Sequence, residues 1–295
     1  TDGSESVTDA RKIILSFMEK AWRRPVSTEE VDRKLVIFTK LRNAKISFKN
    51  AIIETLATVL SSSNFLYLAQ SDKPEEGNPM ENPKDFGLAT RLAIFLWSSL
   101  PDDELLDLAG RGELDDSKTL VTQAKRMLAD PRAERLIRHF VRQWLGMDLL
   151  DYLEVDAKAY PKFDPNLKKS MSEEPIAFFR EVLGTNRSVL DFLHSDYAMI
   201  NERLANHYGI PNVYGTKLRK VSLKPAHNRG GLLSQAGLLA MNSDGKDSHP
   251  LKRGIWLLER LLNDPPPPPP PAVPEIDLAD PEILKLSLKL SLIHI

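Results

Sequence analysis

Apolar residues recur every three or four positions through most of this 295-residue chain, and this spacing constrains the fold more than any other feature. Ile14, Met18 and Trp22 follow it in the first segment, and Ser27 with Glu30 forms the capping-box signature of a second one. Each such stripe is stable in water only when it is buried against another. We therefore expect an all-α fold, a bundle-like assembly of many helices.

Further segments of the same kind follow along the chain. Pro175 lies inside the longest of them and is expected to kink that helix or divide it in two. The loop 209–228 is the region in which we expect a small strand pair, so the strand content should be low. The other predicted helical segments lie at 47–60, 86–99, 102–109, 117–129, 132–145, 165–183, 189–193, 201–208, 231–241 and 250–262.

Breaks that contain proline and glycine divide these helices into modules. The stretch 72–84 gathers prolines, a glycine and charges. Seven consecutive prolines, Pro265 to Pro271, forbid helix and sheet and impose an extended spacer roughly 20 Å long. The predicted divisions are an N-terminal helical module at 1–71, a central one at 84–210, a C-terminal one at 211–264, a polyproline linker at 265–275 and the start of a further domain at 276–289.

Composition excludes several classes of function. The 40 Lys and Arg residues balance 41 Asp and Glu residues, so no basic field favours nucleic acid as a partner. The apolar runs are too short to span a membrane. The absence of cysteine excludes disulfides, thiolate catalysis, cysteine-bound zinc and covalently attached haem within this segment. The chain opens at Thr1 instead of Met, which is typical of a fragment or a processed product.

Two groups of polar residues suggest sites but have simpler explanations. Arg135, Arg138, His139 and Arg142 share one helical face, which we interpret as a solvated surface paired with acids such as Glu134 in preference to an anion site. A second group could be imagined as metal ligands, but its histidines lack the i, i+4 spacing that brings two imidazoles together. We predict no metal site there, and interpret this group as capping and pairing residues: His194, Asp196, Asn201 and His207.

The candidate binding residues come from the last third of the chain. Arg229, Gly230 and Gly231 precede a helix, where the glycines serve either an anion site or, more simply, a tight turn. The polar turn 242–248 runs into another helix at Pro250, and it is either a binding site or a turn whose Asp247 or Ser248 caps that helix. No catalytic motif is present, so catalytic residues are not assigned. The predicted binding residues are His207, Arg229, Ser248, His249 and Arg253.

Several stretches read together resemble a known family. They are FMEKAWRRPVSTEEVDR at 17–33, SNFLYL at 63–68, LATRLAIFLWSSLPDD at 88–103, residues 127–145, NERLANHYGIP at 201–211, RGGL at 229–232 and SHPLKRGIWLLE at 248–259. The chain is similar in these stretches to planctomycete secreted domains of unknown function that are associated with c-type cytochromes. The final LSLIHI at 290–295 departs from the family and equals a translated transposon end used in sequencing libraries, so we interpret it as an artefact of metagenomic assembly.

The resemblance implies an extracytoplasmic location, periplasmic or secreted, and a place in a multidomain protein. Haem c is expected in flanking domains and not in this segment, and those cytochrome c-type domains are the expected partners. The implied role is docking, scaffolding or the positioning of an extracellular substrate or protein partner. One alternative is part of a haem-dependent redox enzyme acting on an extracellular substrate such as a carbohydrate, and another is a purely structural helical spacer.

Overall fold

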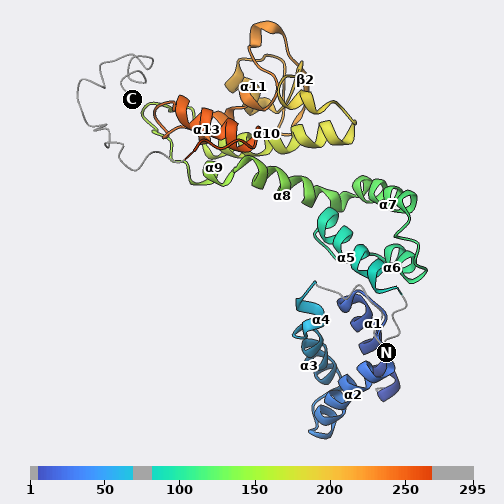
Figure 1. Ribbon diagram of the computed structural model, residues 1–295. Coiled ribbons are helices and arrows are strands. Elements are labelled where there is room, and N and C mark those ends of the chain that lie inside the picture. The colour runs from blue at the N-terminus through green and yellow to red at the C-terminus, as the bar shows by residue number, and fades with distance from the viewer. Residues whose placement is uncertain (1–5, 69–81, 268–295) are drawn as a thin grey trace.

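The computed structural model describes residues 6–68 and 82–267, and within them it confirms the all-α prediction. The described residues form thirteen α-helices, four short 3-10 turns and one two-stranded sheet. Figure 1 shows three groups of elements, with one helix, α8, running from the second group into the third. The end of the polyproline linker, the predicted domain start at 276–289 and the predicted artefact at 290–295 lie outside the described residues.

The first group consists of α1 (Val7–Trp22), α2 (Thr28–Asn43), α3 (Phe48–Leu60) and α4 (Ser63–Leu66). The capping box predicted at Ser27 and Glu30 is confirmed, because each side chain accepts a hydrogen bond from the other residue's backbone N–H. The stripes of the first three helices meet in a core of their own, built from Ala10, Ile14, Met18, Ala21, Trp22, Val31, Leu35, Phe38, Ala51, Ile52 and Val59.

Arg23 holds the end of this group together. Its backbone lies in the left-handed region at φ 58°, its side chain is 2% exposed, and its guanidinium donates to the carbonyl oxygens of Ala21, Asn64 and Tyr67 at 3.0, 3.0 and 3.3 Å. Arg23→Met is expected to destabilise the group by about 3 kcal/mol, since three carbonyl oxygens lose the charged donor of a buried side chain. Thermal unfolding with Arg33→Met as an exposed control tests this, and equal shifts in Tm for the two variants would contradict it.

The second group contains α5 (Pro83–Trp97), α6 (Asp103–Gly110) and α7 (Ser117–Ala129). Trp97 is its central side chain: it is fully buried, its Nε1 donates to the Met127 carbonyl at 2.9 Å, and the Arg132 guanidinium lies 3.4 Å from its ring centroid. The Asp85 carboxylate accepts the Leu114 N–H at 2.9 Å and thereby fixes the loop between α6 and α7.

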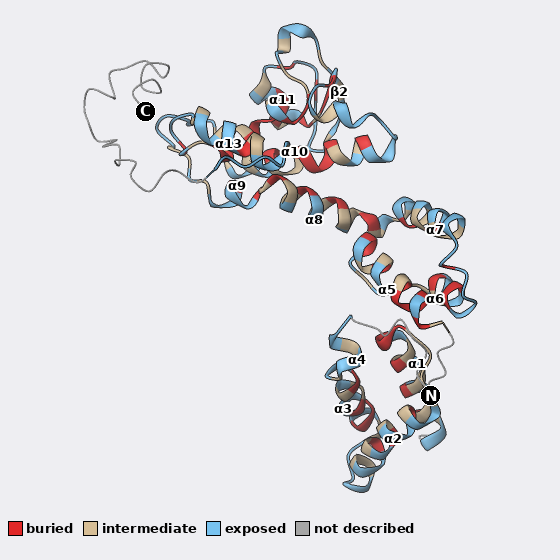
Figure 2. Ribbon diagram, viewed as in Figure 1, coloured by how far each residue is buried: buried red, intermediate tan, exposed pale blue. Residues whose placement is uncertain are grey.

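Helix α8 (Glu134–Leu145) joins two cores. Leu136 near its start packs against the core of the second group, whereas Ile137 and Val141 belong to the core of the third. Its basic face is paired as the solvated-surface interpretation predicts: Arg138 contacts Glu134 and Glu173, Arg142 contacts Asp148 and Asp151, and His139 is exposed. Figure 2 shows the alternation of buried and exposed positions along this helix.

The third group continues with α9 (Asp148–Tyr152), α10 (Pro165–Gly184), α11 (Glu202–Tyr208), α12 (Ala236–Met241) and α13 (Pro250–Arg260). Of the two effects expected of Pro175, a kink or a division, the division is wrong, since α10 is one helix of 20 residues. Pro175 has no N–H to donate to the Met171 carbonyl. Gly237 of α12 lies against that carbonyl, and a Cβ there would be 2.6 Å from the oxygen. The close packing of Gly237 thus occurs where Pro175 leaves a carbonyl of α10 without its helical hydrogen bond.

The small sheet differs from the prediction in one strand. Its second strand, β2 (Arg219–Ser222), lies in the predicted loop, but its partner β1 (Tyr197–Ile200) precedes α11. The strands are antiparallel, with Tyr197 opposite Ser222 and Ile200 opposite Arg219. The segment 231–241 is also not one helix, because a 3-10 turn (Leu232–Ser234) precedes α12. The core of this group extends on both sides of residue 210, from Ile137 to Trp256.

Candidate functional site

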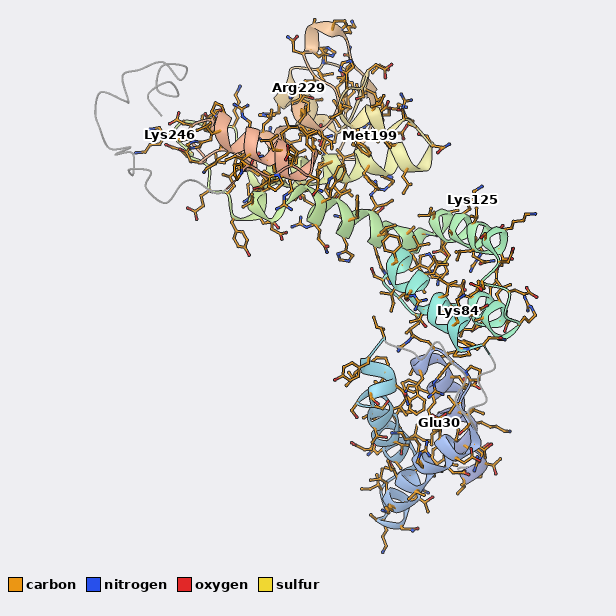
Figure 3. All side chains as sticks on the ribbon, viewed as in Figure 1. Glu30, Lys84, Lys125, Met199, Arg229 and Lys246 are labelled. Atoms are coloured by element: carbon orange, nitrogen blue, oxygen red, sulfur yellow. The ribbon has the colours of Figure 1, made fainter. Side chains whose placement is uncertain are left out.

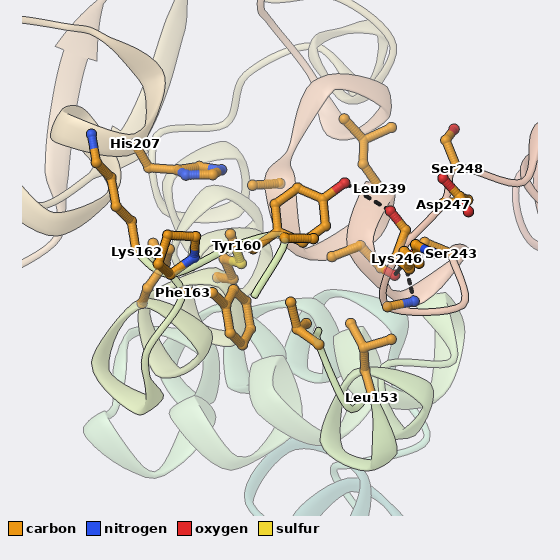
Figure 4. Close-up of a pocket in the computed structure, with 18 of the residues that line it drawn as sticks. Leu153, Tyr160, Lys162, Phe163, His207, Leu239, Ser243, Lys246, Asp247 and Ser248 are labelled. Carbon is orange, nitrogen blue, oxygen red and sulfur yellow. Dashed lines mark hydrogen bonds between the residues drawn. The ribbon is translucent and has the colours of Figure 1, made fainter. Parts of the chain in front are cut away.

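The third group contains a cavity of about 530 Å³ that is open to solvent and is formed by segments that lie far apart in the sequence. The loop before α10, the end of α11, helix α12 and the turn before α13 all contribute to it (Figure 4). Most of the exposed surface inside it is apolar. Its apolar lining consists of Leu153, Val155, Ala159, Pro161, Phe163, Leu167, Met171, Ala236, Leu239 and Ala240.

The polar turn 242–248 forms one end of this cavity and is held rigidly against the loop before α10. The Asp156 N–H donates to the Gly245 carbonyl at 3.0 Å, and the Tyr160 hydroxyl donates to the Lys246 carbonyl at 2.7 Å. Gly245 has φ +91°, and a Cβ at this position would lie 1.8 Å from the Glu154 carbonyl oxygen. Packing of backbone on backbone therefore sets the shape of this end.

The helix-capping interpretation of this turn is wrong. The N-cap of α13 is His249, and no side chain caps this helix end. Ser248 Oγ instead accepts a hydrogen bond from Arg253 at 2.5 Å, while Asp244 accepts the backbone N–H groups of Lys246 and Asp247. These backbone hydrogen bonds lower the pKa of Asp244 to about 2. The side chain of Asp244 therefore closes the turn, and the hydroxyl group of Ser248 orients Arg253.

Four of the five predicted binding residues line this cavity: His207, Arg229, Ser248 and Arg253. His249 is not among the lining residues, and its Nε2 lies 3.3 Å from Asp244 Oδ2. Figure 3 labels two of the lining residues of the third group, Arg229 and Lys246, which come from different loops. Sequence reasoning missed Lys162 and Tyr160, because the loop 153–163 that carries them has no periodic pattern.

The cavity lining carries an excess of positive charge. Lys162, Arg229, Lys246 and Arg253 line it, against Asp247 as the one acidic residue of the lining. Neither Arg229 nor Arg253 forms an ion pair with a carboxylate in the described ranges 6–68 and 82–267, unlike Arg138 or Arg203 elsewhere in this group. The field inside the cavity therefore favours an anion.

A buried polar network lies behind the Arg229 side of the cavity. Glu174 of α10 is 1% exposed, and its Oε2 accepts the Tyr208 hydroxyl at 2.5 Å. The same hydroxyl accepts the Ala236 N–H at 2.8 Å. The Arg229 guanidinium stacks 3.7 Å from the Tyr208 ring centroid and donates to the Ser234 carbonyl at 2.6 Å. Arg229 thus contacts both the cavity and this network.

Burial dominates the protonation of these groups. It raises the pKa of Glu174 to about 8, because the opposing effects of the Tyr208 hydrogen bond and the Arg229 charge are smaller. Burial and the charges of Arg229 and Arg203 lower the pKa of His207 below its usual range. Near neutral pH the carboxyl group is thus largely protonated and the imidazole largely neutral. The sequence offered no signal for this, since Glu174 resembles any acidic residue of an amphipathic helix.

The pair Gly230 and Gly231 serves close packing of backbone. A Cβ on Gly230 would lie 2.2 Å from the Ser195 carbonyl oxygen, and one on Gly231 would lie 2.6 Å from that of Leu193. Their φ angles are +142° and +73°. Gly231 N–H also donates to Ser195 Oγ at 3.1 Å. This arrangement agrees with the tight-turn interpretation, and it places Arg229 next to Tyr208.

The second group of polar residues considered for metal binding is dispersed. Asn201 caps α11 and donates to Ser170 Oγ at 3.0 Å, as expected of a capping residue. His194 and Asp196 are exposed. No cluster of three or more His, Asp or Glu side chains suited to a metal ion occurs in the described part of the chain. In those same residues, no helix combines the length and apolar character needed to cross a bilayer.

Comparison with known proteins gives three family matches in consecutive order. Residues 9–70 match PSD5, protein of unknown function (DUF1595), and residues 84–210 match PSD4, protein of unknown function (DUF1592). Residues 229–291 match PSCyt3, protein of unknown function (DUF1588). These matches confirm the family resemblance expected from the sequence motifs. No curated protein and no solved structure matches the chain.

Proposed function

We propose that this chain, which matches PSD5, PSD4 and PSCyt3 domains of unknown function in consecutive order, positions a ligand beside cytochrome domains, as its resemblance to planctomycete cytochrome-associated proteins implies. In this proposal the module is extracytoplasmic, and haem c is carried by flanking domains, because this chain contains no cysteine to attach it. The observation that carries the proposal is the apolar cavity with its convergent cationic side chains.

The size and lining of the cavity support ligand binding. Pockets for small molecules are typically about 300–1,000 Å³, mostly apolar, with a few placed polar groups. The cavity of about 530 Å³ fits this description. Its walls are also held in place before any ligand arrives, by the contacts of Gly245 with Glu154 and of Tyr160 with Lys246. A preformed site avoids the entropic cost of ordering a loop on binding.

The cavity lining favours holding a ligand over transforming it. His207 is the one lining residue whose ordinary pKa lies near neutrality, and no carboxylate is within hydrogen-bonding distance of it in the described ranges to orient it as a general base. The redox-enzyme alternative would use the same cavity, with the chemistry supplied by haem in another domain. The structural-spacer alternative predicts that the cavity binds nothing.

A neutral apolar probe tests the proposal. N-phenyl-1-naphthylamine, which fluoresces strongly in apolar surroundings, is expected to bind the full chain saturably at one site. Ala240→Phe, which places a ring in the cavity, is expected to weaken this binding at least tenfold because the ring takes the space of the probe. Titration followed by fluorescence measures both affinities.

Ala57→Phe is the matched control, since Ala57 lies on the exposed face of α3, away from the cavity. It should bind the probe as tightly as the unmodified chain. Absence of saturable binding to the unmodified chain, or equal affinity in Ala240→Phe, would refute ligand binding in this cavity and favour the spacer alternative.

A further inference from the structure

The cavity has a distinct anion-holding end. Arg229 lies beside His207 there, and its positive charge is one reason for the lowered pKa of that imidazole. Figure 4 shows His207 and Lys162 at one end of the cavity and Lys246, Asp247 and Ser248 at the other. At the second end Asp247 and the nearby Asp244 oppose the charges of Lys246 and Arg253. The Arg229 end, in contrast, has no acidic residue in the lining.

Arg229 is fixed in place for this task. The stack on Tyr208 and the hydrogen bond to the Ser234 carbonyl use one face and one nitrogen of the guanidinium. Its remaining N–H groups have no carboxylate partner in the part of the chain that the structure describes. A guanidinium with several free donors in a fixed plane is suited to a carboxylate or another oxyanion.

The buried carboxyl group behind Arg229 does not compete for its charge. Glu174 is fully enclosed, and its ionised form would pair with Arg229 and cancel the field at this end of the cavity. Burial keeps the carboxyl group neutral near pH 7. Gln235, whose buried Oε1 has no hydrogen-bond partner among the described residues, lines the same small internal space as Glu174.

We propose that the ligand of this cavity is an amphiphilic anion whose charged group is held by Arg229 and whose apolar body lies on Phe163, Met171 and Leu239. This inference rests on the proposed ligand-positioning function and specifies its ligand class. The apolar lining disfavours small hydrophilic anions, because such a ligand would leave the apolar surface of Phe163, Met171 and Leu239 in contact with water. The cationic end selects an oxyanion over a neutral molecule of the same shape.

A pair of probes that differ in one group tests the inference. 8-Anilino-1-naphthalenesulfonate is N-phenyl-1-naphthylamine with one added sulfonate, so their comparison isolates the charge. The full chain is expected to bind the sulfonate at least tenfold more tightly. Arg229→Gln should lower the affinity for the sulfonate about tenfold and change the affinity for the neutral probe less than twofold. Fluorescence titration at pH 7 measures all four values.

Two further variants separate charge from structure. Arg229→Lys keeps the charge but lacks the planar set of donors, so it is expected to retain only part of the preference for the sulfonate. Arg135→Gln removes an exposed arginine of α8 outside the cavity and should change neither affinity. The inference would be overturned if Arg229→Gln lowered the affinity for both probes equally. It would also be overturned if Arg229→Lys lost as much of the preference for the sulfonate as Arg229→Gln does. Failure of the neutral probe to bind the unmodified chain refutes the proposed function, whereas equal affinity for the two probes refutes only the ligand class.

Discussion

Glu174→Gln is expected to stabilise the third group by on the order of 5 kcal/mol at pH 9, with almost no effect at pH 4. The folded protein holds the Glu174 proton up to about pH 8, whereas an unfolded carboxyl group loses it near 4.5. Between these values the folded state binds more protons, so the unmodified chain loses stability as pH rises. Glutamine removes this loss because it has no proton to release. Denaturant unfolding at pH 4, 7 and 9 measures the difference.

The neighbouring Glu173 provides a control of opposite sign. Its carboxylate pairs with Arg138 at 2.6 Å, and this hydrogen bond lowers its pKa. A carboxyl group of this kind contributes stability above its unfolded pKa and loses it as pH falls. Glu173→Gln should therefore destabilise the protein at pH 7 and 9 and converge with the unmodified chain in acid. A stability gain in Glu174→Gln that is the same at pH 4 and pH 9 would refute the buried, protonated state.

Gly230→Ala is expected to destabilise the third group by about 4 kcal/mol, among the larger effects of single substitutions. The added Cβ would lie 2.2 Å from the Ser195 carbonyl oxygen, and the backbone there cannot move freely because Ser195 is buried and hydrogen-bonded. The φ of +142° is also strained for any residue with a side chain. Since Arg229 is the preceding residue, the displaced backbone should also weaken binding of the sulfonate probe.

Gly209→Ala is the control that introduces the strain of a positive φ without a steric clash like that of Gly230→Ala with Ser195. Gly209 has φ +69°, and a Cβ there would contact nothing within 4 Å. Its substitution should therefore cost only about 1 kcal/mol of conformational strain. Thermal unfolding of both variants gives the comparison. If Gly230→Ala were no more destabilising than Gly209→Ala, the close approach of backbone to backbone at Ser195 would be disproved.

The positions of most helices could be predicted because they depend on local information. Capping residues and apolar stripes placed the predicted starts and ends of α3 and α7 within about one residue of those in the structure. The errors have specific physical causes. Pro175 was expected to kink α10 or divide it in two, and the division does not occur because this part of the helix is buried, with Gly237 against the freed carbonyl. The first strand was missed because Tyr197–Ile200 is too short to show a period of its own.

The candidate site was foreseen only in its residue types. His207, Arg229, Ser248 and Arg253 were selected from the sequence as polar residues near helix ends, with no information on whether they meet. The structure gathers them around one cavity, and adds Lys162 from a loop without pattern. His249, chosen for the same reasons, does not line the cavity, because its side chain contacts Asp244.

The sequence by itself determined that this chain is helical and where most of its helices lie, because hydrogen bonding, capping and the spacing of apolar residues act within a few positions along the chain. The family was also readable from local motifs. The tertiary structure alone decided that Glu174 is enclosed beside Tyr208, that Arg229 has no carboxylate partner among the described residues, and that an apolar floor lies before it. These properties depend on burial and on distances between segments remote in sequence, and a linear pattern does not contain them.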